Sequence, residues 1–430
     1  MTEKIIEINA DKFDEIVLKG DKVVVDFYST ECPPCEALAT KYDALSELYG
    51  NDIQFVKIFR QGNKDLATSL DVVSSPTVLF YDKGERVGDT LSGGVKRSDM
   101  IRNLDQLIHE KRAEEIKKSI KHIETECEVI VLGGGPAGLT AGLYLAQSHN
   151  DVILVDTAMP GGYVATTHQV SNYPGFVEPQ PGFMLSHYMS EQAKEAGVKY
   201  RAAVEITSID LEKKEIVIDD VETLKAKKII VSTGSNPRPL GVKGEVKYRG
   251  DGISYCATCD AKYFDDKEVV VIGGGNSAIE EALFITKFAK KVTIVHQFAE
   301  MQANKEAQKK AFDNEKIEFY LEHEPREFKK HGTMDMEVIV EDLKTKEMKS
   351  LRTNGIFVFV GFQANLDGME DAFELDQWGY VKTDDLMKTN KKDIFAVGDL
   401  RSKAYRQITT AVADGTIAAI TASRELDNEE

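Results

Sequence analysis

The residues best suited to redox chemistry are two pairs of cysteines, Cys256/Cys259 and Cys32/Cys35. In each pair two residues separate the thiols, a spacing that suits either a small, reversible disulfide ring or half of a zinc site. An acid, Asp260, directly follows the first pair. The fifth cysteine, Cys127, heads a predicted strand, and we expect it to be a plain buried residue.

The composition indicates a multidomain enzyme rather than a nucleic-acid or membrane protein. With 430 residues, 42% of them hydrophobic, the chain is long enough for roughly three domains. Its net charge of -18 disfavours nucleic acid and anionic membranes. We find no signal-peptide core, no apolar run that could span a membrane and no second Cys/His pair at zinc-ligand spacing. A cytoplasmic protein without a metal site is expected.

The outer pair, Cys32/Cys35, lies between a predicted strand and a predicted helix. Residues 22–28 are a β-branched run typical of a buried strand, and apolar residues with helical spacing follow over 36–49. Cys32 is therefore expected at a helix N-terminus, where the partial positive charge favours a thiolate. Further elements are expected as strands at 53–58 and 78–81, a hairpin turn at 82–85, and helices at 64–70 and 97–108.

This first block, residues 1–108, resembles thioredoxin. The resemblance implies that Cys32 is the exposed nucleophile, Cys35 the resolving thiol and Asp26 a buried proton acceptor. It also implies that Pro76 is a cis-proline facing the disulfide. Two positions depart from the family: Glu31 and Pro33 stand where thioredoxins usually have Trp and Gly. Residues 109–125 are charge-rich and are expected to be a helical, solvated linker, either a simple spacer or a tether that also lets this domain swing.

A dinucleotide-binding fingerprint follows the linker. A strand at 128–132 leads into Gly133-x-Gly135-Pro136-Ala137-Gly138 and a helix to about residue 148, and a second strand at 152–155 ends in Asp156. Glycines in this turn let the backbone approach a pyrophosphate at the helix N-terminus, and the acid holds a ribose hydroxyl.

Several later motifs follow one another along the chain in the order found in the FAD-binding half of low-molecular-weight thioredoxin reductases, which they resemble. The resemblance implies that Asp399 meets the ribityl side of the flavin and that Arg406-Gln407-Ile408 meets its ring. Tyr163 departs from the family, which normally has Gln after the glycine pair. The implied FAD-binding residues of this second set are Gly161, Gly162, Tyr163, Asn172, Thr233, Gly234, Gly398, Asp399, Arg406, Gln407 and Ile408.

A second dinucleotide-binding fingerprint lies inside the sequence of the FAD-binding domain. A strand at 269–272 leads into Gly273-x-Gly275-Asn276-Ser277-Ala278, a helix over 278–289 and a strand at 292–295. The predicted fold is α/β: an N-terminal thioredoxin fold, then two Rossmann-like, three-layer ββα domains, the second inserted into the first. The boundaries are expected at 126–238 and 366–430 for the FAD domain and 239–365 for the inserted one, with hinges near 237–239 and 361–365.

The stretch after the second fingerprint favours NADH over NADPH. Reductases of this type that use NADPH have three arginines here, since guanidinium groups match the 2'-phosphate. This chain instead has residues 296–302, His-Gln-Phe-Ala-Glu-Met-Gln, without any arginine. Glu300 would repel a phosphate but could accept a hydrogen bond from a free ribose hydroxyl. The run 298–301 is also similar to the flavoprotein subunit of alkyl hydroperoxide reductases, which use NADH.

The inner pair is Cys256/Cys259. Residues 256–260, which contain it, match the Cys-Ala-Thr-Cys-Asp motif of the reductases letter for letter. The resemblance implies that Cys259 lies against the flavin, that Cys256 attacks the next disulfide and that Asp260 transfers the proton. It implies a homodimeric FAD-dependent thioredoxin reductase whose fused thioredoxin is the first acceptor, with protein disulfides or a peroxiredoxin downstream. The alternatives are a peroxiredoxin reductase, a ferredoxin-linked reductase, and a redox sensor that has lost turnover.

Overall fold

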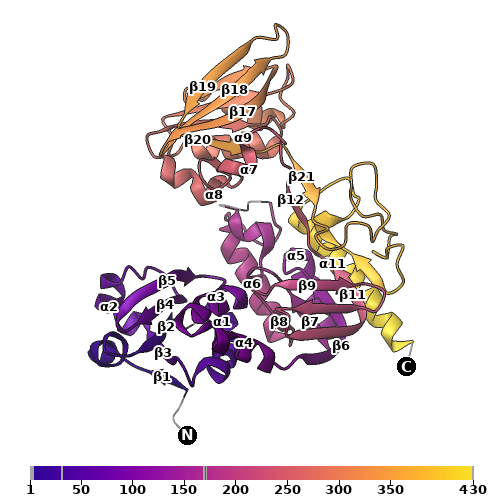
Figure 1. The fold of residues 1–430 in the computed structure, drawn as a ribbon. Helices are drawn as coiled ribbons and strands as arrows, with labels where there is room; N and C mark the ends of the chain where they lie inside the picture. Colours follow the sequence, from indigo (N-terminus) through magenta and orange to yellow (C-terminus); the bar gives the residue numbers. More distant parts are fainter. Residues whose placement is uncertain (1–3, 31, 168–169, 171, 429–430) are drawn as a thin grey trace.

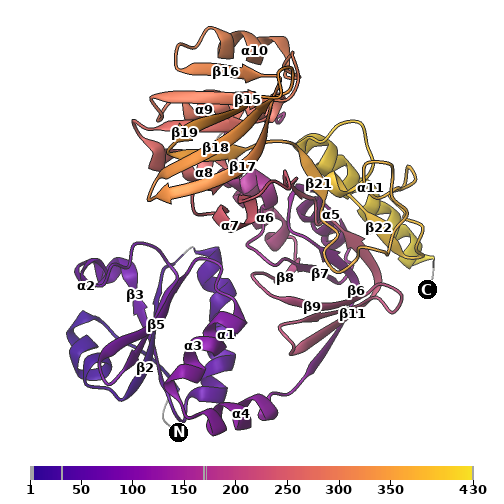
Figure 2. The same cartoon turned by 45° about the horizontal axis from the view of Figure 1, so that its top comes forward.

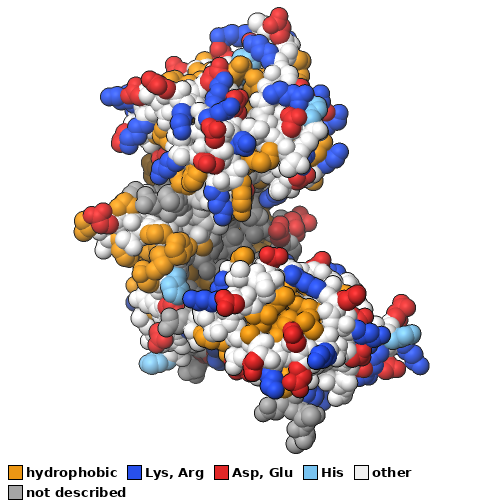
Figure 3. Space-filling view, turned by 90° about the vertical axis from the view of Figure 1, so that its left-hand side faces the viewer, with side chains coloured by type: hydrophobic (Ala, Val, Ile, Leu, Met, Phe, Trp, Pro, Cys, Tyr) orange, Lys and Arg blue, Asp and Glu red, His pale blue; other side chains and the backbone are white. Residues whose placement is uncertain are grey.

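The computed structural model describes residues 4–30, 32–167, 170 and 172–428. The chain forms three bodies (Figure 1): an N-terminal domain, a central domain that contains the C-terminus, and an inserted domain at the far end of the central one. Figure 2 shows the same arrangement tilted so that its top comes forward, with the N-terminal domain beside the central domain. In the space-filling view of Figure 3, basic and acidic side chains are interspersed over the surface. The predicted α/β fold with one nucleotide domain inserted into the other is confirmed.

The N-terminal domain is a five-stranded sheet in the order β1-β3-β2-β4-β5. Its central strand β2 carries a run of valines that is buried on both faces, where β-branched side chains pack well. Apolar clusters cover both faces of the sheet. The strands are β1 (Ile5–Glu7), β2 (Lys22–Tyr28), β3 (Gln54–Phe59), β4 (Thr77–Asp82) and β5 (Glu85–Ser92), and the helices are α1 (Pro33–Tyr49), α2 (Lys64–Ser69) and α3 (Arg97–Leu107).

Most of the predicted linker is part of a domain in the structure. Helix α4 (Glu110–Ser119) buries Ala113 and Ile116, and Ile116 belongs to the apolar core of the N-terminal domain. Arg112 pairs with Asp52 of the same domain at 2.9 Å. Strand β6 then begins at Ile123, so only residues 120–122 lie between helix and strand. The segment is helical, as expected, but it holds to the N-terminal domain.

The central domain is built on a seven-stranded sheet, β8-β7-β6-β11-β10-β9, with β22 pairing β11. Strand β6 is longer than the predicted 128–132, because its polar first half pairs in parallel with β11. Helix α5 packs against both α6 and α11. The strands are β6 (Ile123–Leu132), β7 (Val152–Val155), β8 (Lys199–Arg201), β9 (Ile206–Asp210), β10 (Glu215–Ile218), β11 (Glu222–Val231) and β22 (Ile394–Ala396), and the helices are α5 (Pro136–Gln147), α6 (Gly182–Glu195) and α11 (Ile408–Asp427).

The inserted domain repeats this plan with a parallel sheet, β13-β20-β14-β15-β16, and an antiparallel sheet, β17-β18-β19. Helix α9 ends at Ile285, earlier than predicted, where Thr286 Oγ1 donates to the Leu283 carbonyl and competes with helix continuation. Its strands are β13 (Ile253–Ser254), β14 (Glu268–Ile272), β15 (Lys291–His296), β16 (Ile317–Leu321), β17 (His323–Gly332), β18 (Asp335–Asp342), β19 (Met348–Thr353) and β20 (Gly355–Val358), and its helices are α7 (Glu245–Tyr248), α8 (Ala257–Asp260), α9 (Asn276–Ile285) and α10 (Lys305–Phe312).

Two short antiparallel strands, β12 (Ser235–Pro237) and β21 (Phe362–Ala364), join the central and inserted domains. They lie where the hinge crossings were predicted, and a two-stranded ribbon is a connection that permits one domain to rotate against the other. That rotation stays a prediction. Within the described ranges, no helix has the length and apolar composition to cross a bilayer.

The packing of α4 is testable with a matched pair of isoleucines. Ile116→Ala should lower the free energy of unfolding of the N-terminal domain by about 2–4 kcal/mol, because it leaves a cavity in a packed core. Ile123→Ala, at a side chain that is 56% exposed, should change it by less than about 1 kcal/mol. Hydrogen exchange of the α1 and α3 amides measures both. Equal effects would show that α4 is not part of the domain's core.

Candidate redox and nucleotide sites

The outer cysteine pair forms a disulfide between Cys32 and Cys35 at the start of α1. Cys32 is the N-cap residue of this helix, and the Cys35 amide donates to Cys32 Sγ at 3.3 Å. The prolines at 33 and 34 occupy the first turn, where a missing N–H costs no hydrogen bond. The helix N-terminus thus lies at the sulfurs, as predicted, and favours the thiolate form after reduction.

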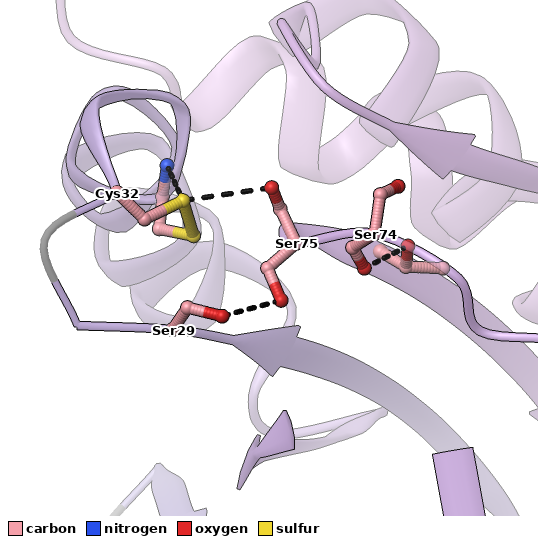
Figure 4. The surroundings of a disulfide bond; sticks show 6 residues. Ser29, Cys32, Ser74 and Ser75 are labelled. Carbon is pink, nitrogen blue, oxygen red and sulfur yellow. Dashed lines mark hydrogen bonds between the residues drawn. A yellow bond between two sulfur atoms is a disulfide. The ribbon is translucent and has the colours of Figure 1, made fainter. Parts of the chain in front are cut away.

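A loop from the start of β4 faces this disulfide (Figure 4). Cys32 Sγ lies 3.5 Å from the Ser75 carbonyl oxygen, and the Ser29 hydroxyl donates to Ser75 Oγ at 2.7 Å. The Ser75–Pro76 peptide is cis, which confirms the prediction for Pro76. Glu31, the other departure near this site, lies outside the described residues. An acceptor chain approaching the sulfurs would meet this loop.

Asp26 is buried in the middle of β2, as predicted. It is 2% exposed, and its Oδ1 atom has no hydrogen-bond partner among the described residues. Burial raises the pKa of Asp26 to about 7, although the neighbouring charge of Lys57 on β3 opposes the shift. A group with this pKa can hold or release a proton near neutral pH, which suits the predicted proton acceptor.

The fifth cysteine, Cys127, is buried at 9% exposure, which confirms that prediction. Burial raises the pKa of the Cys127 thiol to about 12. A thiol of this kind is a poor nucleophile at neutral pH. The redox chemistry therefore rests on the two pairs.

A cavity of about 930 Å³ in the central domain gathers the motifs of the first fingerprint. The glycine loop after β6 comes together there with the end of β7, the turn after β11 and the segment before α11. A cavity of this size suits a cofactor as large as a dinucleotide. Of the residues predicted to bind FAD, those lining it are Gly133, Gly135, Pro136, Ala137, Asp156, Gly162, Tyr163, Thr233, Gly234, Gly398, Asp399, Arg406, Gln407 and Ile408.

The glycine loop has the geometry that a pyrophosphate requires. Gly133 has a positive φ of 106°, and Gly135 is the N-cap residue of α5. A Cβ atom at Gly138 would lie 1.9 Å from the Gly133 carbonyl oxygen, so only glycine lets the helix pack against the loop. The helix N-terminus and its free N–H groups thus point into the cavity.

Two acids of this cavity fit a flavin nucleotide. Asp156 accepts from the Gly134 amide at 2.6 Å and from the Ala158 amide at 2.8 Å, which orients its carboxylate at the end of β7. Asp399 Oδ1 is buried with no hydrogen-bond partner among the described residues, although the Lys403 ammonium lies 3.7 Å from it. Burial raises the pKa of both acids. Since a buried acceptor needs a donor, Asp399 is suited to a hydroxyl of the cofactor.

Three predicted residues, Gly138, Gly161 and Asn172, do not line the cavity. Gly161 donates from its amide to the Gly134 carbonyl at 2.6 Å, and Asn172 donates to Gln407 Oε1 at 3.0 Å. Gly161 and Asn172 therefore hold in position residues that line the cavity, Gly134 and Gln407. The sequence missed other lining residues, among them Lys96 and the 204–209 and 365–369 segments, because they belong to no local motif.

The second glycine loop shows the same geometry in the inserted domain. Gly273 has a positive φ of 133°, and Gly275 is the N-cap residue of α9. The loop at 297–304 is tied to it, since the Gln302 amide donates to the Gly274 carbonyl at 2.8 Å and the Asn304 amide donates to Asn276 Oδ1 at 2.7 Å. Ser277 lines the cavity of the central domain, so the second glycine loop faces that cavity.

The predicted acid of this site, Glu300, lies exposed on that loop, and Ala278 is buried in the first turn of α9. His296 ends β15 directly against Gly274, where a Cβ atom would lie 2.5 Å from the imidazole ring. Its Nε2 atom is buried with no hydrogen-bond partner among the described residues. The loop therefore places a carboxylate and an imidazole nitrogen near the second glycine turn, where a ribose hydroxyl could find polar partners.

The inner cysteine motif contacts the wall of the central cavity. Cys256 is disulfide-bonded, and its amide donates a hydrogen bond to Ser254 Oγ at 3.0 Å. Thr258 donates from its hydroxyl to the Thr166 carbonyl of the central domain. Thr166 ends the short helix at 162–166, which carries Tyr163 of the cavity wall. The side chain of Cys259 lies outside the described residues.

Comparisons with known proteins agree with this geometry. A family model described as pyridine nucleotide-disulphide oxidoreductase matches residues 127–415, and one described as thioredoxin matches residues 4–106. The thioredoxin reductase of Peptoclostridium litorale is 43% identical over 312 residues, which are 71% of this chain and 98% of that protein. A 34.2 kDa protein in the rubredoxin operon of Clostridium pasteurianum is 37% identical over 70% of this chain and 97% of its own.

Among solved structures, that of Lactococcus lactis thioredoxin reductase in its FR conformation has a TM-score of 0.66 at 39% identity, over 70% of this chain and 99% of that one. The chain belongs to the pyridine nucleotide-disulphide oxidoreductases, flavoproteins that use FAD and a nicotinamide. Within that class it is of the thioredoxin reductase type, and a thioredoxin domain is fused to its N-terminus.

The buried carboxyl of Asp26 predicts a pH-dependent stability. Its pKa is higher in the folded than in the unfolded protein, so the acid destabilises the fold increasingly as pH rises from about 4 to 7. Asp26→Asn should therefore stabilise the N-terminal domain at pH 8 by up to about 4 kcal/mol and have little effect near pH 4. Denaturation at both pH values measures this, with the exposed Asp65→Asn as control. If Asp26→Asn changed the free energy of unfolding equally at both pH values, the raised pKa of Asp26 would be contradicted.

Proposed function

We propose that the enzyme passes two electrons from a reduced nicotinamide through FAD and the Cys256/Cys259 dithiol to its own Cys32–Cys35 disulfide, and on to protein disulfides. The observation that carries the proposal is the hydrogen bond from Thr258 of the inner cysteine motif to Thr166, which ends the short helix whose Tyr163 lines the cavity. When bound, the flavin supplies two-electron exchange between a nicotinamide and a disulfide. The residues of the chain supply the rest.

The exchange between the two pairs is a pair of thiolate attacks. The Cys256 thiolate attacks Cys32 Sγ, the Cys32–Cys35 bond breaks, and Cys35 leaves as a thiolate that takes up a proton. Cys259 then attacks Cys256, Cys32 is released, and the inner disulfide forms again. Two electrons and two protons have moved to the outer pair, and Asp260 and Asp26 are the acids proposed to exchange protons with the inner and outer pairs.

NADH is the proposed donor. Residues 296–302 contain no arginine, and Glu300 is exposed on a loop that hydrogen bonds to the glycine turn. A carboxylate there repels a 2'-phosphate and can accept a hydrogen bond from a free ribose hydroxyl.

A homodimer also stays a prediction. It is supported by exposed apolar residues on the layer of α6, α5 and α11, namely Tyr144, Tyr188, Ile417 and Ile420.

A second candidate, a peroxiredoxin reductase, is favoured by the similarity of residues 298–301 to the alkyl hydroperoxide reductase flavoprotein. In a peroxiredoxin reductase, the N-terminal domain would transfer its electrons to one peroxidase instead of to many protein disulfides. NADH-dependent turnover with a purified peroxiredoxin and peroxide, but not with insulin, would favour this second candidate over the first.

The order of the two pairs is testable with single substitutions. Cys256→Ser should leave flavin reduction by NADH intact but slow reduction of the Cys32–Cys35 disulfide by more than about 100-fold, because the attacking thiol is gone. Cys32→Ser should still reduce a small disulfide such as DTNB through the inner pair and lose insulin reduction. Cys127→Ala is the control and should behave as wild type. Unchanged insulin reduction by Cys32→Ser would remove the N-terminal domain from the path.

The donor preference is tested by steady-state rates with both nucleotides. The ratio kcat/KM should favour NADH by at least about tenfold, equivalent to ~1.4 kcal/mol of differential binding. Glu300→Gln should narrow this ratio, since it removes the repulsive charge, whereas Glu315→Gln, at an exposed site before β16, should not. A wild-type preference for NADPH would exclude the proposed donor. Reduction by reduced ferredoxin alone would point to the ferredoxin-linked class.

A further inference from the structure

The N-terminal domain is docked on the central domain through a buried lysine. Lys41, on α1, is only 8% exposed. Its ammonium donates to the Val95 carbonyl of its own domain at 3.0 Å, and across the interface to the carbonyls of Ala202 at 3.2 Å and Ala203 at 2.6 Å. An ammonium group has three N–H donors, and the docked position provides an acceptor for each.

Charges on the two domains are complementary around this contact. Arg97, at the start of α3, is buried, and it interacts electrostatically with Asp219 of the central domain, as Lys41 does. At the exposed edge, Lys194 of α6 pairs with Glu36 of α1 at 2.5 Å. A buried cation needs such partners, because removing it from water is otherwise costly. The interface is therefore specific to this pair of surfaces.

The carbonyls that Lys41 holds belong to a segment that supports the flavin cavity. The Ala203 amide donates to the Ala158 carbonyl at 3.0 Å, and the Val204 amide donates to the Asp156 carbonyl at 3.3 Å. The Ala158 amide in turn donates to Asp156 Oδ1 at 2.8 Å. A short chain of hydrogen bonds thus runs from Lys41 of the N-terminal domain to the acid predicted to hold the ribose.

One residue of the N-terminal domain reaches the cavity itself. Lys96, in the loop before α3, lines it together with Asp156 and Glu205 of the central domain. FAD carries a negatively charged diphosphate, and a cation on the wall of its site attracts it. The wall of the cofactor site is therefore completed by the domain that was expected only to receive electrons.

We propose that the docked N-terminal domain is part of the FAD-binding site: Lys41 fixes it on the 202–204 segment, and Lys96 closes the cavity beside Asp156. Docking and flavin binding then strengthen each other, because a coupling between two binding events is reciprocal. The proposal rests on FAD as the occupant of the cavity, and it adds a second role for the N-terminal domain beyond electron acceptance.

The interface is packed loosely enough to open. A cavity of about 680 Å³ lies between the two domains, lined on one side by the Pro33, Glu36 and Ala37 face of α1 and on the other by Met159 and Lys194. Unfilled space of this kind lowers the contact energy of an interface. The domain can therefore leave the docked position to bring Cys32 to the inner pair and return to it afterwards.

The test compares FAD affinity and domain position in the full-length protein, without turnover. Lys41→Met removes the ammonium that donates to the carbonyls of Ala202 and Ala203 across the interface. Gly94→Phe blocks docking sterically, because a Cβ atom there would already lie 3.5 Å from Ala203 Cβ and 3.8 Å from Met159 Cγ. Both should raise the Kd of FAD, titrated into the apoprotein by flavin fluorescence, by about tenfold. Lys96→Gln should raise it by about fivefold, whereas Lys64→Gln on exposed α2 should leave it unchanged.

Small-angle X-ray scattering of the same samples reports docking directly. The radius of gyration should increase in Gly94→Phe and should decrease when FAD is added to wild-type apoprotein. Undocked variants that bind FAD within twofold of wild type would overturn the coupling, as would an undocked wild-type holoprotein. A wild-type chain that binds no FAD would instead refute the cofactor assignment in the proposed function, so the two failures are distinguishable.

Discussion

Electrons move between two dithiols only when a sulfur of one touches a sulfur of the other, and this requirement dominates the molecule. Each pair is fixed on a rigid support: Cys32 and Cys35 at the start of α1, and Cys256 just before α8. In the described arrangement the inner motif contacts the wall of the flavin cavity and the outer pair faces its own Ser75 loop. The proposed electron path therefore requires the two domains to move so that the pairs can meet.

The connections between domains suit that movement. The inserted domain is joined by the β12–β21 ribbon, and the N-terminal domain by residues 120–122 between α4 and β6. Both connections are short, so the predicted motion would be a rotation about a fixed point and not free diffusion on a long tether. Because α4 is packed on the N-terminal domain, the reach of Cys32 is limited by this short pivot.

The docked position of the N-terminal domain explains how a mobile carrier and a stable cofactor site can share one chain. The domain contributes Lys96 to the cavity wall and is held by Lys41, yet a cavity of about 680 Å³ weakens the interface. A tight interface would stop the carrier from reaching Cys256, and a weak one would leave the flavin site open. The observed interface, with a specific buried lysine and loose packing around it, serves both needs.

The sequence by itself determined the local chemistry of this protein. Both cysteine pairs, the two glycine turns and Asp156 follow from motifs in which neighbours along the chain set the geometry, whereas the cis peptide before Pro76 was implied only by the resemblance to thioredoxin. A strand followed by a glycine turn and a helix places a pyrophosphate site within about a dozen residues. Such short-range constraints leave the rest of the chain little influence.

Only the tertiary structure decided how these local sites combine. Lys41 is an ordinary helical residue in the sequence, and its partners Ala202 and Ala203 are about 160 residues away. Lys96 and Ser277 enter the flavin cavity from two other domains, and the charged segment at 109–125 became a packed helix and the start of a strand. These contacts depend on how separate surfaces meet, which the composition and periodicity of a single segment do not encode.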